Sequence, residues 1–261
     1  MNSDRKSNSL EGKFSLIAGG AKNLGGRLSR DLATHGAAGI CVHYHSDSSG
    51  EAAEATVEAV RARSVDAFAV QADLTRPSEV ERVFTAATDR FGGLDIAINT
   101  AGMVLKKSLT EVTEAEFDEM FDINAKAAFF FLQQSGLHLN DGGKICTIVT
   151  SLLGAFTGLY SSYAGSKAPV EHFTRAASKE FGPRGISVTA VGPGPMDTPF
   201  FYGQESEGAV AYHSSAADLS PFSSTGLTDV EDIVPLVRFL VSDGWWVTGQ
   251  TILANGGYTT K

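Results

Sequence analysis

The sequence predicts an α/β fold in which a doubly wound parallel sheet of about seven strands carries helices on both faces. Two observations predict this class. Short apolar runs alternate with segments of helical periodicity along nearly the whole chain of 261 residues. Within these runs the apolar residues are consecutive rather than alternating with polar ones, which is typical of strands that are buried on both faces.

The expected elements follow one another in a regular order. Strands are predicted where the apolar runs are short or rich in β-branched residues, at 13–18, 38–44, 66–71, 94–99, 144–150, 186–191 and 251–254. Helices are predicted where apolar residues recur at helical spacing or where Ala and Glu dominate, at 24–35, 50–63, 78–91, 113–137, 161–181 and 229–242. No linker or repeat divides these elements, so we expect one domain over residues 11–261 after a polar N-terminal tail at 1–10.

One long stretch, residues 199–228, shows neither pattern. Among Ser, Gly and Glu it carries five aromatic residues, namely Phe200, Phe201, Tyr202, Tyr212 and Phe222. An irregular loop of this length in a compact domain is usually functional or disordered. We therefore expect a substrate lid over an apolar pocket, with a mobile surface excursion as the alternative.

Composition and charge limit the classes of function. Hydrophobic residues make up 43% of the chain and charged residues 20%, which is ordinary for a globular protein with a core. The net charge of -9 argues against nucleic acid or an anionic membrane as the main partner. No run is long enough to span a bilayer, and Cys41 and Cys146 lie in apolar runs, as buried thiols in a reducing compartment would. We expect a cytoplasmic enzyme or binding protein.

A tyrosine and a lysine four positions apart, Tyr163 and Lys167, are the first candidates for chemistry. This spacing places both side chains on one face of the predicted helix. A neighbouring cation favours the phenolate, so the pair predicts a phenol pKa lowered from about 10 and a tuned proton donor. The alternative is an ordinary pair on a helix surface, but of the six tyrosines only Tyr163 has a Lys at this offset.

A glycine-rich turn follows the first predicted strand and opens the first helix. It reads Ala18-Gly19-Gly20-Ala21-Lys22-Asn23-Leu24-Gly25. Glycines allow the backbone to approach a pyrophosphate, and a helix N-terminus supplies N–H donors and positive potential. Such a turn is a weak signal by itself, but its position after the first strand of an alternating chain strengthens the prediction of a nucleotide site.

At these residues the chain resembles the single-domain members of the short-chain dehydrogenase/reductase family, whose fold is Rossmann-like. The family pattern for the turn is Thr-Gly-x-x-x-Gly-x-Gly, and the chain departs from it twice, with Ala18 for the Thr and Asn23 for the middle Gly. Asn is the non-glycine residue that best tolerates positive φ, so the turn can keep its shape. The resemblance extends over about residues 10–258 and implies cofactor contacts at Gly19, Ala21, Lys22, Asn23, Leu24 and Gly25.

The end of the second strand predicts which cofactor binds. An acidic residue there would hydrogen-bond the adenosine ribose and repel a 2′-phosphate. The expected position falls instead on Tyr44. His45 and Ser46 can donate to a phosphate, and Lys22 can pair with it, so NADP(H) is the expected cofactor.

Two features near this strand end favour other interpretations. Asp47 opposes the NADP(H) prediction, because a shift of a few residues in register would bring an acid closer to the ribose. His43 and His45 lie two apart on one face of the strand, but with no third ligand evident we expect no metal.

Further matches to the family follow along the chain. Asp73-Leu74 after the third strand resembles the acidic-plus-aliphatic pair that contacts adenine in the family. Asn99-Thr100-Ala101-Gly102 resembles the family's Asn-Asn-Ala-Gly turn. A Pro- and Gly-rich segment after the sixth strand resembles the one that holds the nicotinamide carboxamide. The resemblance thus implies cofactor contacts at Asp73, Leu74, Asn99, Ala101, Gly102, Tyr163, Lys167, Pro193, Gly194, Met196 and Thr198. Each of these matches alone would also fit an ordinary turn.

The resemblance implies a role for each of four catalytic residues. Tyr163 donates a proton to the carbonyl oxygen, and Lys167 lowers the pKa of Tyr163 and binds the nicotinamide ribose. Ser151 hydrogen-bonds the carbonyl oxygen. Asn124 holds a water that returns the proton. Thr150 is the competing hydroxyl beside Ser151, but strand alternation points it the other way.

The leading prediction is an NADPH-dependent carbonyl reductase that converts a ketone or aldehyde to an alcohol. A 3-oxoacyl-thioester reductase shares every catalytic residue, but an acyl carrier would favour a basic patch, and residues 199–228 contain no Lys or Arg. A nucleotide-sensing binding protein is the alternative of another class, which the intact catalytic set disfavours. We expect a small-molecule carbonyl or alcohol substrate, and the five aromatic residues of 199–228 suggest a bulky or aromatic ketone. The resemblance also implies a homotetramer or dimer. Trp245 and Trp246 fit either the core or the interface, and we expect them in the interface.

Overall fold

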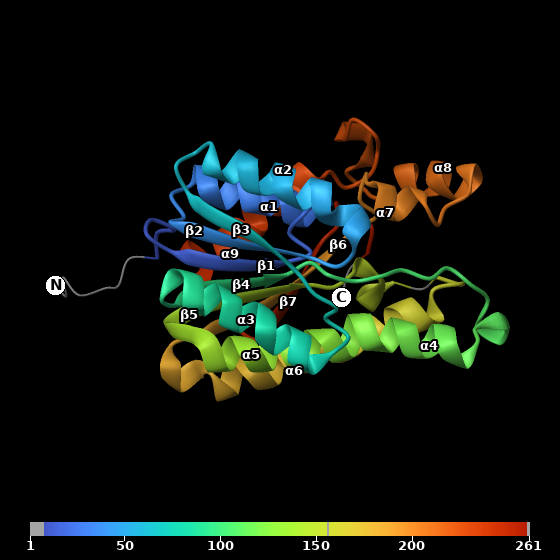
Figure 1. Ribbon diagram of the computed structural model, residues 1–261. Coiled ribbons are helices and arrows are strands. Elements are labelled where there is room, and N and C mark those ends of the chain that lie inside the picture. Colours follow the sequence, from blue (N-terminus) through green and yellow to red (C-terminus); the bar gives the residue numbers. More distant parts are fainter. Residues whose placement is uncertain (1–7, 156, 260–261) are drawn as a thin grey trace.

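A seven-stranded sheet forms the centre of the computed structural model, which describes residues 8–155 and 157–259 (Figure 1). All neighbouring strands pair in parallel, in the order β3-β2-β1-β4-β5-β6-β7. The strands are β1 (Phe14–Ala18), β2 (Gly39–Tyr44), β3 (Asp66–Gln71), β4 (Leu94–Asn99), β5 (Leu139–Ile148), β6 (Ser187–Pro193) and β7 (Gln250–Ala254). The predicted fold class, a doubly wound parallel sheet of the Rossmann type, is confirmed.

Helices cover both faces of this sheet (Figure 1). One face carries α1 (Asn23–Thr34), α2 (Gly50–Arg61) and α9 (Val230–Leu240). The other carries α3 (Pro77–Phe91), α5 (Ala127–His138) and α6 (Ser161–Glu180), with α4 (Glu114–Phe121) at the end of that layer. The short helices α7 (Pro199–Tyr202) and α8 (Glu207–Ala216) lie outside both layers. Single 3₁₀ turns occur at η1 (Asp47–Ser49), η2 (Leu109–Glu111), η4 (Ser151–Gly154), η5 (Gly182–Arg184), η6 (Ser220–Phe222) and η7 (Asp243–Trp246).

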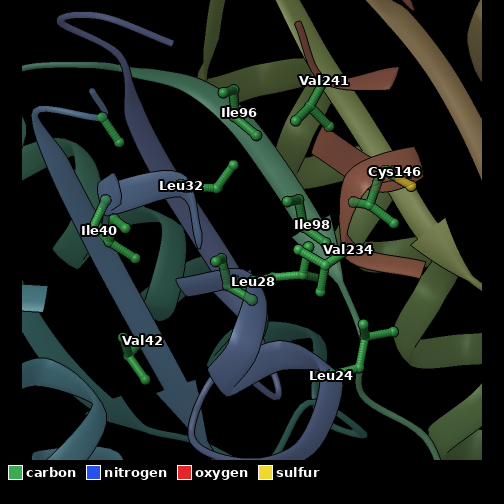
Figure 2. Close-up of a cluster of buried hydrophobic side chains, with 14 of the residues drawn as sticks. Leu24, Leu28, Leu32, Ile40, Val42, Ile96, Ile98, Cys146, Val234 and Val241 are labelled. Carbon is green, nitrogen blue, oxygen red and sulfur yellow. The ribbon is translucent and has the colours of Figure 1, made fainter. Parts of the chain in front are cut away.

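Each face of the sheet has its own hydrophobic core. On the α1 side, Leu24, Leu28 and Leu32 recur every four residues and pack on the strands (Figure 2). Full burial of each such leucine stabilises the fold by roughly 2 kcal/mol. Alternating strand residues point to opposite faces, so Cys41 lies in the core of the α3 side and Cys146 in that of the α1 side. Both thiols are buried, as predicted.

The long helix predicted over residues 113–137 is interrupted. Thr113 and Glu116 form a capping box that starts α4, and a π-helical turn, η3 (Asp122–Lys126), then separates α4 from α5. A π turn inserts one residue into the helical repeat, which the apolar periodicity of the sequence does not reveal. Such turns are frequent at functional sites, and this one contains Asn124.

The 199–228 segment is not the irregular loop that the sequence predicts, because it contains α7, α8 and η6. Ser206 caps α8 by accepting a hydrogen bond from the backbone N–H of Ala209. The two ends of the segment are held side by side. The N–H of Asp197 donates to the carbonyl of Thr228 at 3.0 Å, and the N–H of Thr228 donates to that of Pro195 at 3.0 Å. The segment is therefore a folded excursion with a fixed base.

The start of the chain is described only from residue 8. Leu10, the last residue of the predicted tail, is buried against the α1 side core, so the packed structure includes it. Residues 1–7 of that tail lie outside the described residues. Across residues 8–155 and 157–259 no helix is both long and apolar enough to cross a membrane.

Candidate active site

The candidate residues gather at the carboxyl edge of the sheet. The chain order of the strands reverses between β1 and β4, and ligands of such sheets bind at this switch point. A pocket opens at the same edge, between the ends of β5 and β6, the start of α6 and the 199–228 segment. Its walls include Val104, Val149, Thr150, Ser151, Leu152, Tyr160, Tyr163, Pro193, Gly194, Met196, Thr198, Phe200, Phe201, Gln204 and Glu205.

Tyr163 and Lys167 lie in the first two turns of α6 with their side chains buried. Burial raises the pKa of Tyr163 to about 12, and a hydrogen bond with Thr150 acts in the opposite direction. Burial also lowers the pKa of Lys167 to about 8, and its Nζ donates to the carbonyl of Ile148 at 3.1 Å. The prediction of a lowered phenol pKa is therefore wrong here, because desolvation is the larger effect. The phenol keeps its proton at neutral pH.

Two adjacent hydroxyls, those of Thr150 and Ser151, line the pocket beyond the end of β5. Strand pairing continues only to Val149, whose N–H donates to the carbonyl of Val191 at 2.8 Å. The chain then turns into η4, so side chains no longer alternate between the two faces. The prediction that Thr150 points away is therefore wrong. Ser151 is buried at the pocket wall, as its predicted role requires.

Asn124 is buried in the π turn, and its amide bonds the backbone beyond β4. Its Nδ2 donates to the carbonyl of Met103 at 2.9 Å and to the Ser166 hydroxyl at 3.1 Å. Its Oδ1 accepts from the N–H of Met103 at 3.1 Å. A Cβ on Gly102 would lie 2.8 Å from both this Oδ1 and the Nζ of Lys167. A side chain at residue 102 would therefore displace Asn124 or Lys167, whose polar ends both reach this glycine.

The glycine-rich turn has the shape that its sequence predicts. Asn23 adopts φ +50° and starts α1, so an asparagine does fill the left-handed position. Lys22 is exposed beside it, while Ala21 and Leu24 are buried. Gly25 touches the turn so closely that a Cβ there would lie 2.1 Å from the carbonyl oxygen of Gly19.

The turn after β4 is hydrogen-bonded to this glycine-rich turn. Thr100 donates its hydroxyl to the carbonyl of Ala18 at 2.8 Å. This bond links the two turns even though Ala18 itself has no hydroxyl. Asn99 is buried, and its Oδ1 accepts from the N–H of Ala101 at 3.0 Å. The residues predicted around both turns are thus brought together.

A histidine that the sequence leaves without a role also holds this turn. The Nδ1 of His43 accepts a hydrogen bond from the N–H of Gly19 at 3.0 Å, and its Nε2 lies 3.0 Å from the carbonyl of Ala72. The ring can satisfy both partners only as the neutral tautomer with the proton on Nε2. Burial lowers the pKa of His43 to about 4. The hydrogen bond to the carbonyl of Ala72 and the charge of Asp73 act in the opposite direction but are weaker.

The stability of the protein should therefore decrease in acid because of His43. The folded-state pKa lies below the unfolded value of 6.5, so the unfolded chain binds the extra proton first. The difference corresponds to roughly 3 kcal/mol of unfolding free energy, lost as pH falls from 6.5 toward 4. Denaturant unfolding should show that the unfolding free energy of His43→Asn falls less steeply across this pH range. The amide oxygen of the asparagine can still accept the hydrogen bond from the N–H of Gly19. His172→Asn, at an exposed histidine, should match the wild type, and equal slopes for all three proteins would refute the role of His43.

The residues predicted to face the 2′-phosphate lie beyond the end of β2. His45 is largely exposed and lies 4.0 Å from a carboxylate oxygen of Asp73, and Ser46 bonds the Ser48 hydroxyl at 2.8 Å. Asp47 starts η1 and accepts from Gln71 at 2.8 Å, which directs it to the β3 side. Within the described part of the chain, no three His, Cys, Asp or Glu side chains group closely enough to hold a metal ion.

Asp73 and Leu74 follow β3, and their side chains lie in different environments. Asp73 accepts from the Thr75 hydroxyl at 2.7 Å and faces the edge of the sheet, while Leu74 is buried in the α3 side core. After β6, Pro193 and Gly194 line the pocket. Thr198 is buried and donates to the carbonyl of Met196 at 3.4 Å.

Two pocket residues and a lysine behind the pocket wall form a cluster that the sequence does not predict. Glu205 forms an ion pair with Lys106 and accepts a hydrogen bond from the hydroxyl of Tyr160. Lys106 also lies over the Tyr160 ring, 5.6 Å from its centre. The Tyr160 ring is 6.3 Å from that of Tyr163. The cluster thus ties the 199–228 segment to the wall that carries the catalytic candidate.

The five aromatic residues of the 199–228 segment separate into two groups. Phe200 and Phe201 line the pocket, as expected for a lid. The others do not, and Phe222 is 88% exposed. The prediction of five aromatic residues over the pocket is therefore correct for two of them.

Similarity to known proteins agrees with this site. Residues 19–259 match the family model described as Enoyl-(Acyl carrier protein) reductase. The chain is 36% identical to the short chain dehydrogenase mdpC of Emericella nidulans, over 95% of this chain and 96% of that protein. It is 34% identical to the hydroxynaphthalene reductase-like protein Arp2 of Metarhizium brunneum, over 99% of both.

Among solved structures, a protein from Burkholderia cenocepacia crystallised with bound NADP superposes with a TM-score of 0.97. It is 64% identical, and the match covers 98% of this chain and 97% of that one. A parallel sheet with a glycine-rich turn at its switch point defines a dinucleotide-dependent class of enzyme. This chain belongs to the short-chain dehydrogenase/reductase family of oxidoreductases.

Proposed function

We propose that the protein is an NADPH-dependent carbonyl reductase, which reduces a ketone or aldehyde to an alcohol. The observation that carries this proposal is the pocket itself, where the buried Tyr163 and Ser151 adjoin an otherwise largely apolar wall. The NADP bound to the Burkholderia protein and the reductase-like name of the Metarhizium relative support it. In this proposal residues 11–261 form one catalytic domain and residues 199–228 are its lid.

The residues at the switch point fit NADPH. The backbone at the start of α1 would hold the pyrophosphate, since the turn is glycine-rich and its N–H groups lie at a helix N-terminus. Lys22, exposed at this point, would pair with the 2′-phosphate together with His45 and Ser46. β2 ends at Tyr44, so no acidic residue stands at that position to repel the 2′-phosphate. The remaining contacts would come from Asp73, Asn99, Ala101, Gly102, Lys167, Pro193, Gly194, Met196 and Thr198.

When bound, NADPH supplies the hydride for the carbonyl carbon. Tyr163 is protonated at neutral pH, because burial raises its pKa to about 12, so it holds the proton that a general acid must donate. Ser151 would hydrogen-bond the carbonyl oxygen and fix its orientation toward that phenol. Burial lowers the pKa of Lys167 to about 8, which is still above neutral pH, so this lysine would remain a cation as the phenol loses its proton. Asn124 would hold the water that returns the proton.

A 3-oxoacyl-thioester reductase is the second candidate. The name of the matching family model, which refers to an acyl carrier protein, favours it. Against it stands the wall formed by the described residues, where Glu205 is the single charged side chain and no Lys or Arg is present. A sensor that binds NADPH without turnover is the third, from a different class.

We also propose a cytoplasmic homo-oligomer, a tetramer or dimer. This proposal rests on the family resemblance and on Trp246, which is 78% exposed beside the half-buried Trp245. An exposed tryptophan is typical of an interface residue. Light scattering should give at least twice the chain mass, and a monomer would exclude the proposal.

The proposed function is tested by following NADPH and NADH oxidation over a panel of ketones, aldehydes and 3-oxoacyl thioesters. We expect turnover of bulky or aromatic ketones, with NADPH preferred over NADH. Tight NADPH binding without turnover of any compound would favour the sensor. Turnover confined to the thioesters would favour the second candidate, and a clear preference for NADH would contradict the cofactor assignment.

A further inference from the structure

The candidate pocket carries one charged side chain in its described wall. This is Glu205, from the loop between α7 and α8. Its side chain is only 1% exposed, so its charge is withdrawn from bulk solvent. The wall around it includes Val104, Val149, Leu152, Phe200 and Phe201. In such apolar surroundings charges interact far more strongly than in water.

The cation that pairs with Glu205 lies behind the wall. Lys106 contacts the carboxylate but is not among the residues that line the pocket. Tyr160, which does line it, donates to the other carboxylate oxygen. A compound in the pocket would therefore meet the acid and a neutral phenol before the ammonium group. The ammonium group of Lys106 is already paired with Glu205.

We propose that Glu205 is a specificity-determining residue that admits neutral carbonyl compounds and excludes those that carry a carboxylate. This inference rests on the proposed carbonyl reductase function and adds a substrate class to it. A second carboxylate in the pocket would be repelled by Glu205, and the described wall offers no Lys or Arg to replace its lost hydration. A neutral group of the same shape would meet no such repulsion and has no charge whose hydration would be lost.

The test compares two ketones of one skeleton, methyl 4-acetylbenzoate and 4-acetylbenzoate, which differ by one negative charge. Three variants separate charge from shape. Glu205→Gln keeps an acceptor for Tyr160 but removes the charge, and Glu205→Ala removes both. Glu207→Gln is the matched control, since Glu207 is an exposed acid at the start of α8 in the same segment.

The wild type should prefer the ester over the acid in kcat/KM by at least about tenfold, from charge repulsion in the pocket. Glu205→Gln should reduce this ratio by at least about tenfold, mainly through a lower KM for the acid, because Lys106 is then unpaired. Glu205→Ala should shift the ratio in the same direction, and Glu207→Gln should leave it unchanged. Binding of both ketones to the NADPH-loaded protein is measured by calorimetry beside turnover.

The binding measurement separates failure of this inference from failure of the proposed function. Selective binding of the ester without turnover would refute the reductase but support the selectivity. Equal affinity of the wild type for both ketones would overturn the inference, as would an unchanged ratio in both Glu205 variants. Absence of binding for both ketones would also overturn it.

Discussion

Replacement of Tyr163 by Phe is expected to lower ketone turnover by about a hundredfold to ten-thousandfold, the range typical of general acid catalysis. The variant loses one hydroxyl and keeps the ring, so packing around it should persist. In the proposed mechanism that hydroxyl donates its proton to the carbonyl oxygen, and its pKa of about 12 keeps it protonated at neutral pH. Single-turnover measurement with NADPH and a reactive ketone isolates the loss in the chemical step.

The affinity for NADPH should change little in Tyr163→Phe, because the glycine-rich turn and the carboxyl ends of β1 and β2 are untouched. Tyr202→Phe is the control, since Tyr202 is exposed and its hydroxyl bonds Asp197 at 2.8 Å outside the pocket wall. This variant should retain wild-type turnover. Reduction by Tyr163→Phe at a rate close to that of the wild type would contradict the assignment of the general acid.

Replacement of Gly25 by Ala should weaken NADPH binding by about a hundredfold or more, since a misplacement of about 1 Å in a site has effects of this size. The new Cβ would lie 2.1 Å from the carbonyl oxygen of Gly19 and 2.6 Å from the hydroxyl of Thr100. The contact with Gly19 is with a backbone atom, so no rotation of a side chain can relieve it. The glycine-rich turn must therefore move away from the start of α1, which separates the two parts that would hold the pyrophosphate.

Fluorescence titration of NADPH measures this loss of affinity. Gly208→Ala is the matched control, because a Cβ at Gly208 meets open space in α8. Its affinity for NADPH should equal that of the wild type. A Gly25→Ala variant that binds NADPH as tightly as Gly208→Ala would show that the turn can relax without harm, contrary to the close contact described above.

Features set by neighbouring residues were predictable from the sequence. The glycine-rich turn is one, because the backbone preference of Asn23 is local and the structure has it at φ +50°. The strands are another, since a continuous apolar run has few folded alternatives besides a buried strand. The side-by-side placement of Tyr163 and Lys167 in α6 follows from helical geometry alone.

The electrostatics of that pair were not predictable in the same way. The pKa of Tyr163 depends on how many atoms exclude water from its hydroxyl, and those atoms come from several elements far apart in the chain. Spacing within α6 reports only the neighbouring lysine. The sequence therefore predicted a lowered pKa, whereas burial raises it.

Backbone irregularities were also beyond the reach of sequence patterns. The π turn around Asn124 and the end of alternation at Thr150 each shift side chains by a single residue relative to the regular repeat. Such a shift leaves composition and apolar spacing nearly unchanged. Both irregularities nevertheless decide which polar groups reach the pocket and Lys167.

The sequence by itself therefore determined the parallel sheet, the nucleotide turn and the identity of the candidate acid, because each depends on contacts within a few residues. The tertiary structure alone decided the charge of the pocket. Glu205 is separated by 99 residues from Lys106 and by 45 from Tyr160. Only folding brings these three side chains together, and burial of their charges makes the contact strong enough to select among substrates.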